Sequence, residues 1–200
     1  IVDAFEEAGL RIFGPTAAAA RLESDKSFAK TLMRQQAVPT ADARIFDNYD
    51  QARQYIATRD EPVVIKAAGL AKGKGVIVCE DPADGILAAE RMMVNRIFGD
   101  AGARIIVEER LNGREASLLA IVDGQTIFVL EPAQDYKRLG AGDTGPNTGG
   151  MGSYSPTPVL DDELLAEIQR QILVPTLDGL TREGIHYCGV LYAGLMLTPA

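Results

Sequence analysis

The stretch from Ala43 to Glu109 constrains the fold most, because apolar strands and capped helices alternate along it in a fixed order. Strands are predicted at 43–46, 62–66, 76–79 and 104–109, with helices that start at Asn48 and at Asp81. Asn48 is followed by Gln51 as in a capping box, and Asp81 precedes Pro82, which suits the first helical position. The order β-α-β-β-α-β predicts a compact α+β unit.

Helix signals recur around this unit. Ser24 is the expected N-cap of a helix over 25–37, Gly99 is the expected C-cap of the helix that starts at Asp81, and Pro175 should kink or end a helix that starts at Asp161. These signals place one further helix before the 43–109 unit in the sequence and one after it.

A second antiparallel sheet is predicted from Arg114 onward. The Asp123-Gly124 pair is the strongest hairpin signal in the chain and should join strands at 115–122 and 125–130. A last apolar strand is expected at 190–197. Residues 133–152 are so polar and glycine-rich that we expect no regular structure there, and a loop of this length inside a domain is usually functional.

Composition excludes some classes of function. The net charge of −8 argues against a broad nucleic-acid-binding face. No apolar run is long enough to span a membrane and the first residues lack a signal peptide, so we expect a cytoplasmic protein without membrane partners. Cys79 and Cys188 fit no metal pattern and are expected to be free thiols, and His186 is expected to be structural. The chain lacks an initial Met and opens like the end of a helix, so we expect a piece of a longer protein.

Three segments carry candidate chemistry, and the first is a glycine-lysine loop between two strands. Lys66 ends one strand, and the loop from Gly69 to Gly75 contains Lys72, Gly73 and Lys74. Glycines let backbone N–H groups approach an anion, and lysines bring charge to phosphate oxygens. The loop lacks the Walker pattern and a following helix. The alternative is a mobile hairpin tip kept soluble by its lysines.

The second segment is the end of an apolar strand at Glu108-Glu109-Arg110-Leu111. Its backbone groups between Glu109 and Leu111 suit an adenine edge. Glu115, four residues after Leu111, suits ribose hydroxyls. The alternative is an ordinary strand end with charged surface residues, so this motif is weak by itself.

The third segment combines two adjacent cations with a loop of glycine, threonine and asparagine. Its members are Asp135, Lys137, Arg138, Asp143, Thr144, Gly145, Pro146, Asn147, Thr148, Gly149, Gly150 and Met151. Exposed N–H groups, hydroxyls and the two cations suit a sugar phosphate. A flexible linker would not need this composition.

Together these motifs resemble the phosphoribosylamine–glycine ligase (glycinamide ribonucleotide synthetase) family. The resemblance is carried by residues 63–76, 108–111, 134–138 and 143–152, and Gly14-Pro15-Thr16 and Ser24-Asp25-Lys26 also fit. It covers nearly the whole chain. The lysine loop is shared by many ATP-grasp enzymes, whereas the 143–152 stretch is specific to the family.

The resemblance implies an α+β ATP-grasp fold with the nucleotide between two sheets. It implies three regions: residues 1–40 as the end of an N-terminal domain and an entry helix, 41–111 as a lid subdomain, and 112–200 as a core subdomain. ATP would phosphorylate glycine, and 5-phosphoribosylamine would attack the glycyl phosphate, giving the amide, ADP and phosphate. Lys66 and Lys74 would be the catalytic cations, and Lys26, Lys66 and the Gly69–Gly75 loop would hold the phosphates.

The resemblance also implies Mg²⁺ or Mn²⁺, held by a Glu and an Asn expected past Ala200. Within the chain Glu131 is the one candidate ligand. Two alternatives stay open: another ATP-grasp carboxylate–amine ligase, which should need a different 143–152 loop, and a nucleotide-binding module without catalysis.

Overall fold

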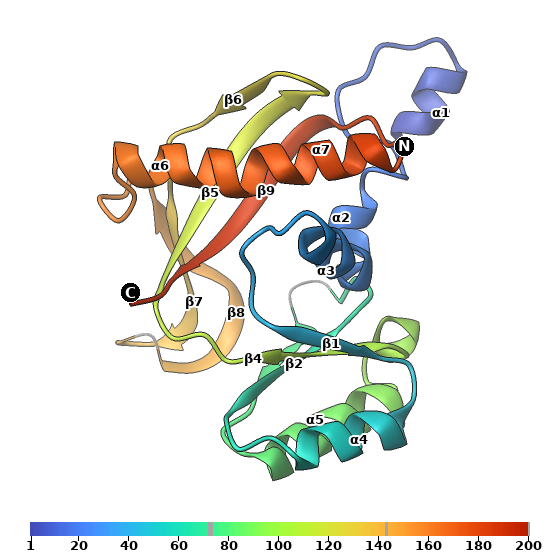
Figure 1. Cartoon of the computed structure of the whole chain (residues 1–200), viewed down its shortest axis with the longest axis vertical. Coiled ribbons are helices and arrows are strands. Elements are labelled where there is room, and N and C mark those ends of the chain that lie inside the picture. The colour runs from blue at the N-terminus through green and yellow to red at the C-terminus, as the bar shows by residue number, and fades with distance from the viewer. Residues whose placement is uncertain (72–73, 143, 200) are drawn as a thin grey trace. The chain divides into compact units, whose positions relative to one another are not determined.

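The computed structural model describes residues 1–71, 74–142 and 144–199. Contacts divide the chain into two compact units. The four-stranded unit comprises Leu22–Thr31 and Thr40–Leu111, and the three-stranded unit comprises Ile1–Arg21, Leu32–Pro39 and Asn112–Ala200. Both units combine helices with antiparallel sheet (Figure 1), which confirms the predicted α+β class.

The four-stranded unit has the predicted order of elements. Its sheet runs β1-β4-β2-β3 with every neighbouring pair antiparallel. The strands are β1 (Ala43–Phe46), β2 (Val63–Ala67), β3 (Val76–Val78) and β4 (Ile105–Glu109), and the helices are α4 (Tyr49–Ala57) and α5 (Pro82–Met93). The prediction of a β-α-β-β-α-β unit is therefore confirmed.

The two faces of this sheet differ in chemistry. Successive strand residues point to opposite faces. Val63, Ile65 and Ala67 of β2, with Ile105 and Val107 of β4, join the apolar core that also contains residues of α4 and α5. Figure 1 shows those two helices side by side along the sheet. The alternate residues of β2 and β4 therefore face away from this core, which leaves the second face for polar side chains.

The predicted N-caps of α4 and α5 are both confirmed. Asn48 Oδ1 accepts from the Gln51 N–H at 3.0 Å, and Asp81 Oδ1 accepts from the Asp84 N–H at 2.8 Å. Each bond satisfies one of the donors that a helix start leaves open. Pro82 follows Asp81 at the start of α5, where its missing N–H has no consequence.

The prediction that Gly99 ends α5 is wrong. The helix ends at Met93, and the Ile97 N–H donates to the Arg91 carbonyl at 3.1 Å, six residues back. Such a bond closes a helix around a left-handed residue, and Arg96 takes that conformation with φ 52°. Gly99 instead begins a short 3-10 helix, η1 (Gly99–Gly102).

The cap of the lysine-bearing helix also differs from the prediction. Ser24 is the last residue of α2 (Arg21–Ser24), and α3 spans Lys26–Gln35. Asp25 Oδ1 accepts from the N–H groups of Ser27 and Phe28 at 3.0 and 3.2 Å. Asp25 is therefore the cap, because only the residue directly before the helix can reach these donors.

The three-stranded unit is built on the long strand β5 (Arg114–Asp123). It lies between β6 (Ile127–Val129) and β9 (Cys188–Leu197) and is antiparallel to both. The antiparallel sheet and its β5–β6 hairpin were predicted. The Asp123-Gly124 turn joins β5 to β6, and Asp123 Oδ1 accepts from the Thr126 N–H at 3.1 Å. The short helix α1 (Val2–Glu7) belongs to the same unit.

Pro175 does not end the helix that precedes β9. α6 (Asp162–Ile168) leads through a π-helical segment, η2 (Gln169–Leu173), into α7 (Val174–Arg182), and the three form one continuous rod (Figure 1). Proline cannot donate to the carbonyl four residues earlier. The wider π turn accommodates this loss, so the distortion takes the place of a helix end.

The expectation that residues 133–152 lack regular structure is wrong. β7 (Gln134–Gly140) and β8 (Thr144–Tyr154) form an antiparallel hairpin with register shifts at Tyr136/Arg138 and Arg138/Gly140. Glycines with positive φ, such as Gly150 at 121°, let the strand follow these irregularities. Backbone pairing rather than strand propensity therefore orders the segment.

Candidate functional site

The second face of the four-stranded sheet carries a buried carboxylate held by a lysine. Lys66 pairs with Ile106, two residues before Glu108, so the Lys66 and Glu108 side chains share one face. Lys66 Nζ donates to Glu108 Oε2 at 2.6 Å. The Glu108 side chain is 5% exposed and that of Lys66 is 28% exposed. Lys66 is thus anchored to Glu108 while its side chain stays partly exposed.

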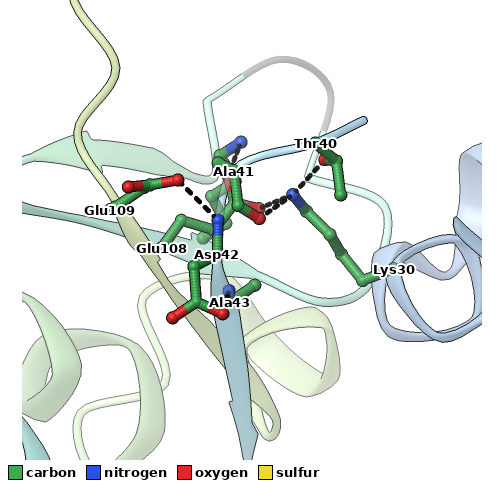
Figure 2. A network of polar contacts seen from close by, with 8 residues as sticks. Lys30, Thr40, Ala41, Asp42, Ala43, Glu108 and Glu109 are labelled. Carbon is green, nitrogen blue, oxygen red and sulfur yellow. Dashed lines mark hydrogen bonds and ion pairs between the residues drawn. The ribbon is translucent and has the colours of Figure 1, made fainter. Parts of the chain in front are cut away.

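Sequence reasoning assigned no role to Lys30, which is the second cation on Glu108. Figure 2 shows Lys30 reaching from α3 to the strand ends. Its Nζ lies 2.7 Å from Thr40 Oγ1, 3.2 Å from the Ala41 carbonyl and 3.4 Å from Glu108 Oε1. Burial lowers the pKa of Lys30, although the Glu108 charge opposes this. The sequence feature that could have indicated a role for Lys30 is its spacing of four residues from Lys26, which places both lysines on one side of a helix.

Lys26 lies at the start of α3 beside the end of the glycine loop. Its Nζ donates to the Gly69 carbonyl at 3.1 Å, and its backbone N–H donates to the Ala68 carbonyl at 2.8 Å. Desolvation lowers the pKa of Lys26 below 10.5, with Glu23 opposing and Lys66 reinforcing the shift. Lys26 and Lys66, the two predicted phosphate ligands, are thus near enough for the charge of one to affect the other.

The glycines at the two ends of the predicted phosphate loop have packing roles. A Cβ on Gly69 would lie 2.7 Å from the Ala101 Cα, and one on Gly75 would lie 2.6 Å from the Ala71 Cβ. The Gly69 N–H already donates to the Ala101 carbonyl at 3.0 Å. Lys74 is exposed, and Lys72 and Gly73 lie outside the described residues. Gly69 and Gly75 therefore anchor the loop, and their identity alone does not argue for an anion.

The backbone beyond β4 presents one donor and one acceptor together. The N–H groups of Glu109 and Arg110 donate to the carbonyls of Asp42 and Pro62 at 3.0 and 3.3 Å. Among the hydrogen bonds of the described residues outside the strand ladders, none engages the Glu109 carbonyl or the Leu111 N–H. Residues two apart share a side of an extended strand. The Glu109 carbonyl and the Leu111 N–H are therefore the two backbone groups that remain for the predicted adenine contact.

Two side chains at this strand end are engaged elsewhere. Glu109 Oε1 accepts from the Asp42 N–H at 2.7 Å (Figure 2), and Arg110 Nη1 lies 2.7 Å from Glu80 Oε2. Their predicted contribution to a nucleotide site therefore rests on backbone atoms.

In the three-stranded unit, the group predicted for ribose contacts a group predicted for the phosphosugar. Lys137 Nζ of β7 donates to Glu115 Oε2 of β5 at 3.0 Å, and the two side chains are 40% and 46% exposed. Partial burial opposes the charged form of Lys137, but the hydrogen bond and charge of Glu115 outweigh it and raise the pKa of Lys137. These two predicted sites adjoin.

The β7–β8 hairpin uses several of its predicted ligands to hold its own backbone. Thr148 Oγ1 donates to the Lys137 carbonyl at 2.8 Å and accepts from the Gly150 N–H at 3.0 Å. Thr144 Oγ1 donates to the Ala141 carbonyl at 3.0 Å. The other described members lie on or beside the same strands: Asp135, Arg138, Gly145, Gly149 and Met151. Asp143 and the side chains of Pro146 and Asn147 lie outside the described residues.

The described residues do not form a metal centre. Over residues 1–71, 74–142 and 144–199, no group of three or more His, Cys, Asp or Glu side chains is arranged to hold an ion. Glu131 is exposed and lies just past the end of β6. The residues present therefore do not by themselves fit a divalent cation.

The structure also describes the two cysteines and the one histidine of the chain. Cys79 and Cys188 are free, as expected, and desolvation raises the pKa of the buried Cys79 thiol to about 11. The His186 ring lies against Gly124 at the β5–β6 turn, where a Cβ on that glycine would meet it. No described helix is both long and apolar enough to cross a membrane.

Comparison with known proteins defines the class of fold. The biotin carboxylase domain of 2-oxoglutarate carboxylase from Hydrogenobacter thermophilus, solved with MgADP, ADP and bicarbonate, aligns with a TM-score of 0.71 at 16% identity. It covers 98% of this chain and 41% of that one. At this identity the likeness concerns the fold alone, which is the ATP-grasp fold that the sequence predicted.

The family follows from closer matches. Residues 24–200 match the family described as phosphoribosylglycinamide synthetase, ATP-grasp (A) domain, and the chain belongs to this family. A phosphoribosylamine–glycine ligase of Rhodopirellula baltica is 53% identical over 100% of this chain and 47% of its own length. The crystal structure of that ligase from Thermotoga maritima aligns with a TM-score of 0.84 at 36% identity, over 93% and 47% of the two chains. The chain thus spans about half the length of these relatives.

Proposed function

We propose that the chain supplies the ATP-binding part of an enzyme that ligates glycine to 5-phosphoribosylamine, with release of ADP and phosphate. The relatives named phosphoribosylamine–glycine ligase support this reaction. The observation that carries the proposal is the polar face of the four-stranded sheet. There two lysines, Lys30 and Lys66, share one buried carboxylate, Glu108, which leaves this cluster one positive charge in excess for an anionic ligand.

The nucleotide contacts follow from the groups that this unit leaves available. Lys66 and Lys26 bind phosphate oxygens, with Lys74 approaching from the loop. The Glu109 carbonyl accepts from the adenine amino group, and the Leu111 N–H donates to a ring nitrogen. Charge-assisted bonds of this kind are among the strongest polar contacts in proteins.

The other ligands are assigned to the three-stranded unit. Glu115 accepts from ribose hydroxyls, and Lys137 and Arg138 bind the phosphate of the phosphosugar. The β7–β8 hairpin provides Asp135, backbone N–H groups and exposed Met151 as the remaining contacts. Support comes from the contact between Lys137 and Glu115, which makes the two ligand sites neighbours.

The chemistry requires positioning and charge neutralisation more than a covalent nucleophile. ATP supplies the phosphoryl group that activates the glycine carboxylate, and the amine of 5-phosphoribosylamine then displaces phosphate from the glycyl carbonyl. Lys66 and Lys74 neutralise the charge on the phosphates.

The proposed partners are small molecules only, and the proposed location is the reducing cytoplasm. The net charge of −8 disfavours nucleic acid as a partner. Two free cysteines are typical of the cytoplasm.

The test is the substrate dependence of ADP formation by the protein as it is naturally made. With ATP and Mg²⁺ present, ADP should appear only when glycine and 5-phosphoribosylamine are both added. ADP formation with a different carboxylic acid, and none with glycine, would identify another ATP-grasp ligase. Binding of ATP without any turnover would leave a nucleotide-binding module.

A further inference from the structure

We propose that Lys30 is a positioning residue for the nucleotide phosphates and that it acts through Glu108. It compensates the Glu108 carboxylate so that Lys66 can move its ammonium from that carboxylate to the phosphates. The inference rests on the proposed function, because it requires ATP to bind at Lys66.

Lys30 is already fully engaged and does not itself reach a ligand. An ammonium group has three donors. The Lys30 ammonium has three oxygen neighbours, the Thr40 hydroxyl, the Ala41 carbonyl and the Glu108 carboxylate (Figure 2). Its side chain is only 12% exposed. Lys30 is therefore fixed in place, with its charge directed at Glu108.

Lys66 differs in each of these respects. Among the described residues, Glu108 is its one hydrogen-bond partner, so two of its donors face a ligand or water. Its side chain is 28% exposed, more than twice the value for Lys30. Of the two cations on Glu108, only Lys66 has the freedom to change partners.

The carboxylate makes the two lysines interdependent. Each Glu108 oxygen faces one of them, Oε1 toward Lys30 and Oε2 toward Lys66. If Lys66 turned to a phosphate without Lys30 present, Glu108 would be a buried, uncompensated charge beside an anion, which is strongly unfavourable. With Lys30 in place, the carboxylate keeps a partner. Lys26 and Glu109 also act electrostatically nearby, but Lys30 is the buried contact that stays.

The competing explanation is that Lys30 only ties α3 to the ends of β1 and β4. Such an anchor would affect stability but would not couple to the charge of Glu108 in nucleotide binding. The two explanations separate in a double-mutant cycle that pairs Lys30→Met with Glu108→Gln. Methionine keeps most of the apolar stem of lysine, and glutamine keeps the shape of the carboxylate.

The experiment titrates the protein as it is naturally made with ATP and Mg²⁺, and separately with adenosine, which lacks phosphates. Lys30→Met should weaken ATP binding about tenfold, the effect of losing one charge-assisted contact, and leave adenosine binding unchanged. Lys30→Met combined with Glu108→Gln should bind ATP as Glu108→Gln alone does. Arg34→Met is the matched control, because Arg34 is exposed one turn further along α3.

Several results would overturn the inference. Unchanged ATP affinity in Lys30→Met would make Lys30 an anchor only. A double variant that binds ATP about tenfold more weakly than Glu108→Gln would show that Lys30 acts on the ligand directly. This second comparison holds even if Lys30→Met fails to fold, because the double variant leaves no buried carboxylate unpaired. If Lys66→Ala itself leaves ATP affinity unchanged, the proposed function fails first and the inference fails with it.

Discussion

Two lysine–carboxylate contacts, one in each unit of the chain, show how burial changes what an ion pair does. Glu108 is 5% exposed and is shared by Lys30 and Lys66, whereas Glu115 is 46% exposed and, among the described residues, forms an ion pair only with Lys137. Water screens the second pair and leaves its partners free to exchange. The first has lost that water, so each charge depends on the others.

The pKa values of the two lysines follow the same division. Desolvation dominates at Lys30 and lowers its pKa even beside a carboxylate. At Lys137 desolvation is again the largest single effect, but the hydrogen bond and charge of Glu115 act together with the charges of Tyr192 and Asp135, and the pKa is raised. Burial therefore holds Lys30 in place beside Glu108, whereas the exposed Lys137–Glu115 pair is an adjustable contact.

The largest expected effect is on stability when each carboxylate is neutralised. Glu108→Gln leaves Lys30 buried without its counter-charge and should lower the free energy of unfolding by about 3 kcal/mol. Glu115→Gln should lower it by less than about 1 kcal/mol. Urea unfolding of both variants measures the difference. Equal losses of unfolding free energy in the two variants would show that burial does not make the Glu108 contacts more important for stability than the Glu115 contact.

The next effect separates Lys137 from its neighbour Arg138. Arg138→Ala should raise the apparent KM for the phosphosugar about tenfold and spare that for ATP, because it removes a phosphate contact. Lys137→Ala should raise both, since it also leaves Glu115 without its partner. Steady-state kinetics with each substrate varied in turn provides the measurement. A rise confined to ATP in the Arg138 variant would contradict the phosphosugar assignment.

A smaller effect is the response of each pair to salt. The coupling energy between Lys137 and Glu115 should be about 0.2–1 kcal/mol at low salt and should vanish near 1 M, where screening acts over about 3 Å. The coupling between Lys30 and Glu108 should persist, because solvent ions do not enter a buried site. Double-mutant cycles at the two salt concentrations compare them. A salt-sensitive Lys30–Glu108 coupling would mean that water reaches that cluster.

The smallest effect concerns pH. Because the folded-state pKa of Lys30 lies below 10.5, the unfolded chain binds more protons between that pKa and 10.5. The contribution of Lys30 to stability therefore increases as the pH rises through this window. The raised pKa of Lys137 acts oppositely: its contribution is complete below 10.5 and is lost above it. The unfolding free energies of Lys30→Met and Lys137→Met should be measured from below to above pH 10.5. Their slopes with pH should differ, and parallel profiles would contradict the opposite pKa shifts of the two lysines.

Local sequence signals were sufficient for the framework of the four-stranded unit. Asn48 and Asp81 cap their helices because a cap depends on neighbours within a few residues. The alternation of β2 and β4 placed Lys66 and Glu108 at strand positions, and their apolar neighbours fixed which face is buried. These features require no knowledge of distant contacts.

Features that depend on tertiary contact could not be predicted in the same way. Lys30 acquires its role from Glu108, 78 positions away in the numbering, and no local pattern marks that contact. The β7–β8 hairpin contains few residues that favour strands, so its backbone pairing could not be predicted from the residue types. The left-handed residue that ends α5 is Arg96, although glycine adopts this conformation more easily and Gly99 was therefore predicted to end the helix.

The most direct measurement of the central claim is an ATP titration of wild-type protein, Lys66→Ala and Lys137→Ala under identical conditions. Loss of the charge-assisted phosphate contact in Lys66→Ala should cost about 1.5–3 kcal/mol of binding free energy. Lys137→Ala should lose less, since its contact is exposed. Unchanged ATP affinity in Lys66→Ala would contradict the account, because the buried face around Glu108 would then not be the phosphate site.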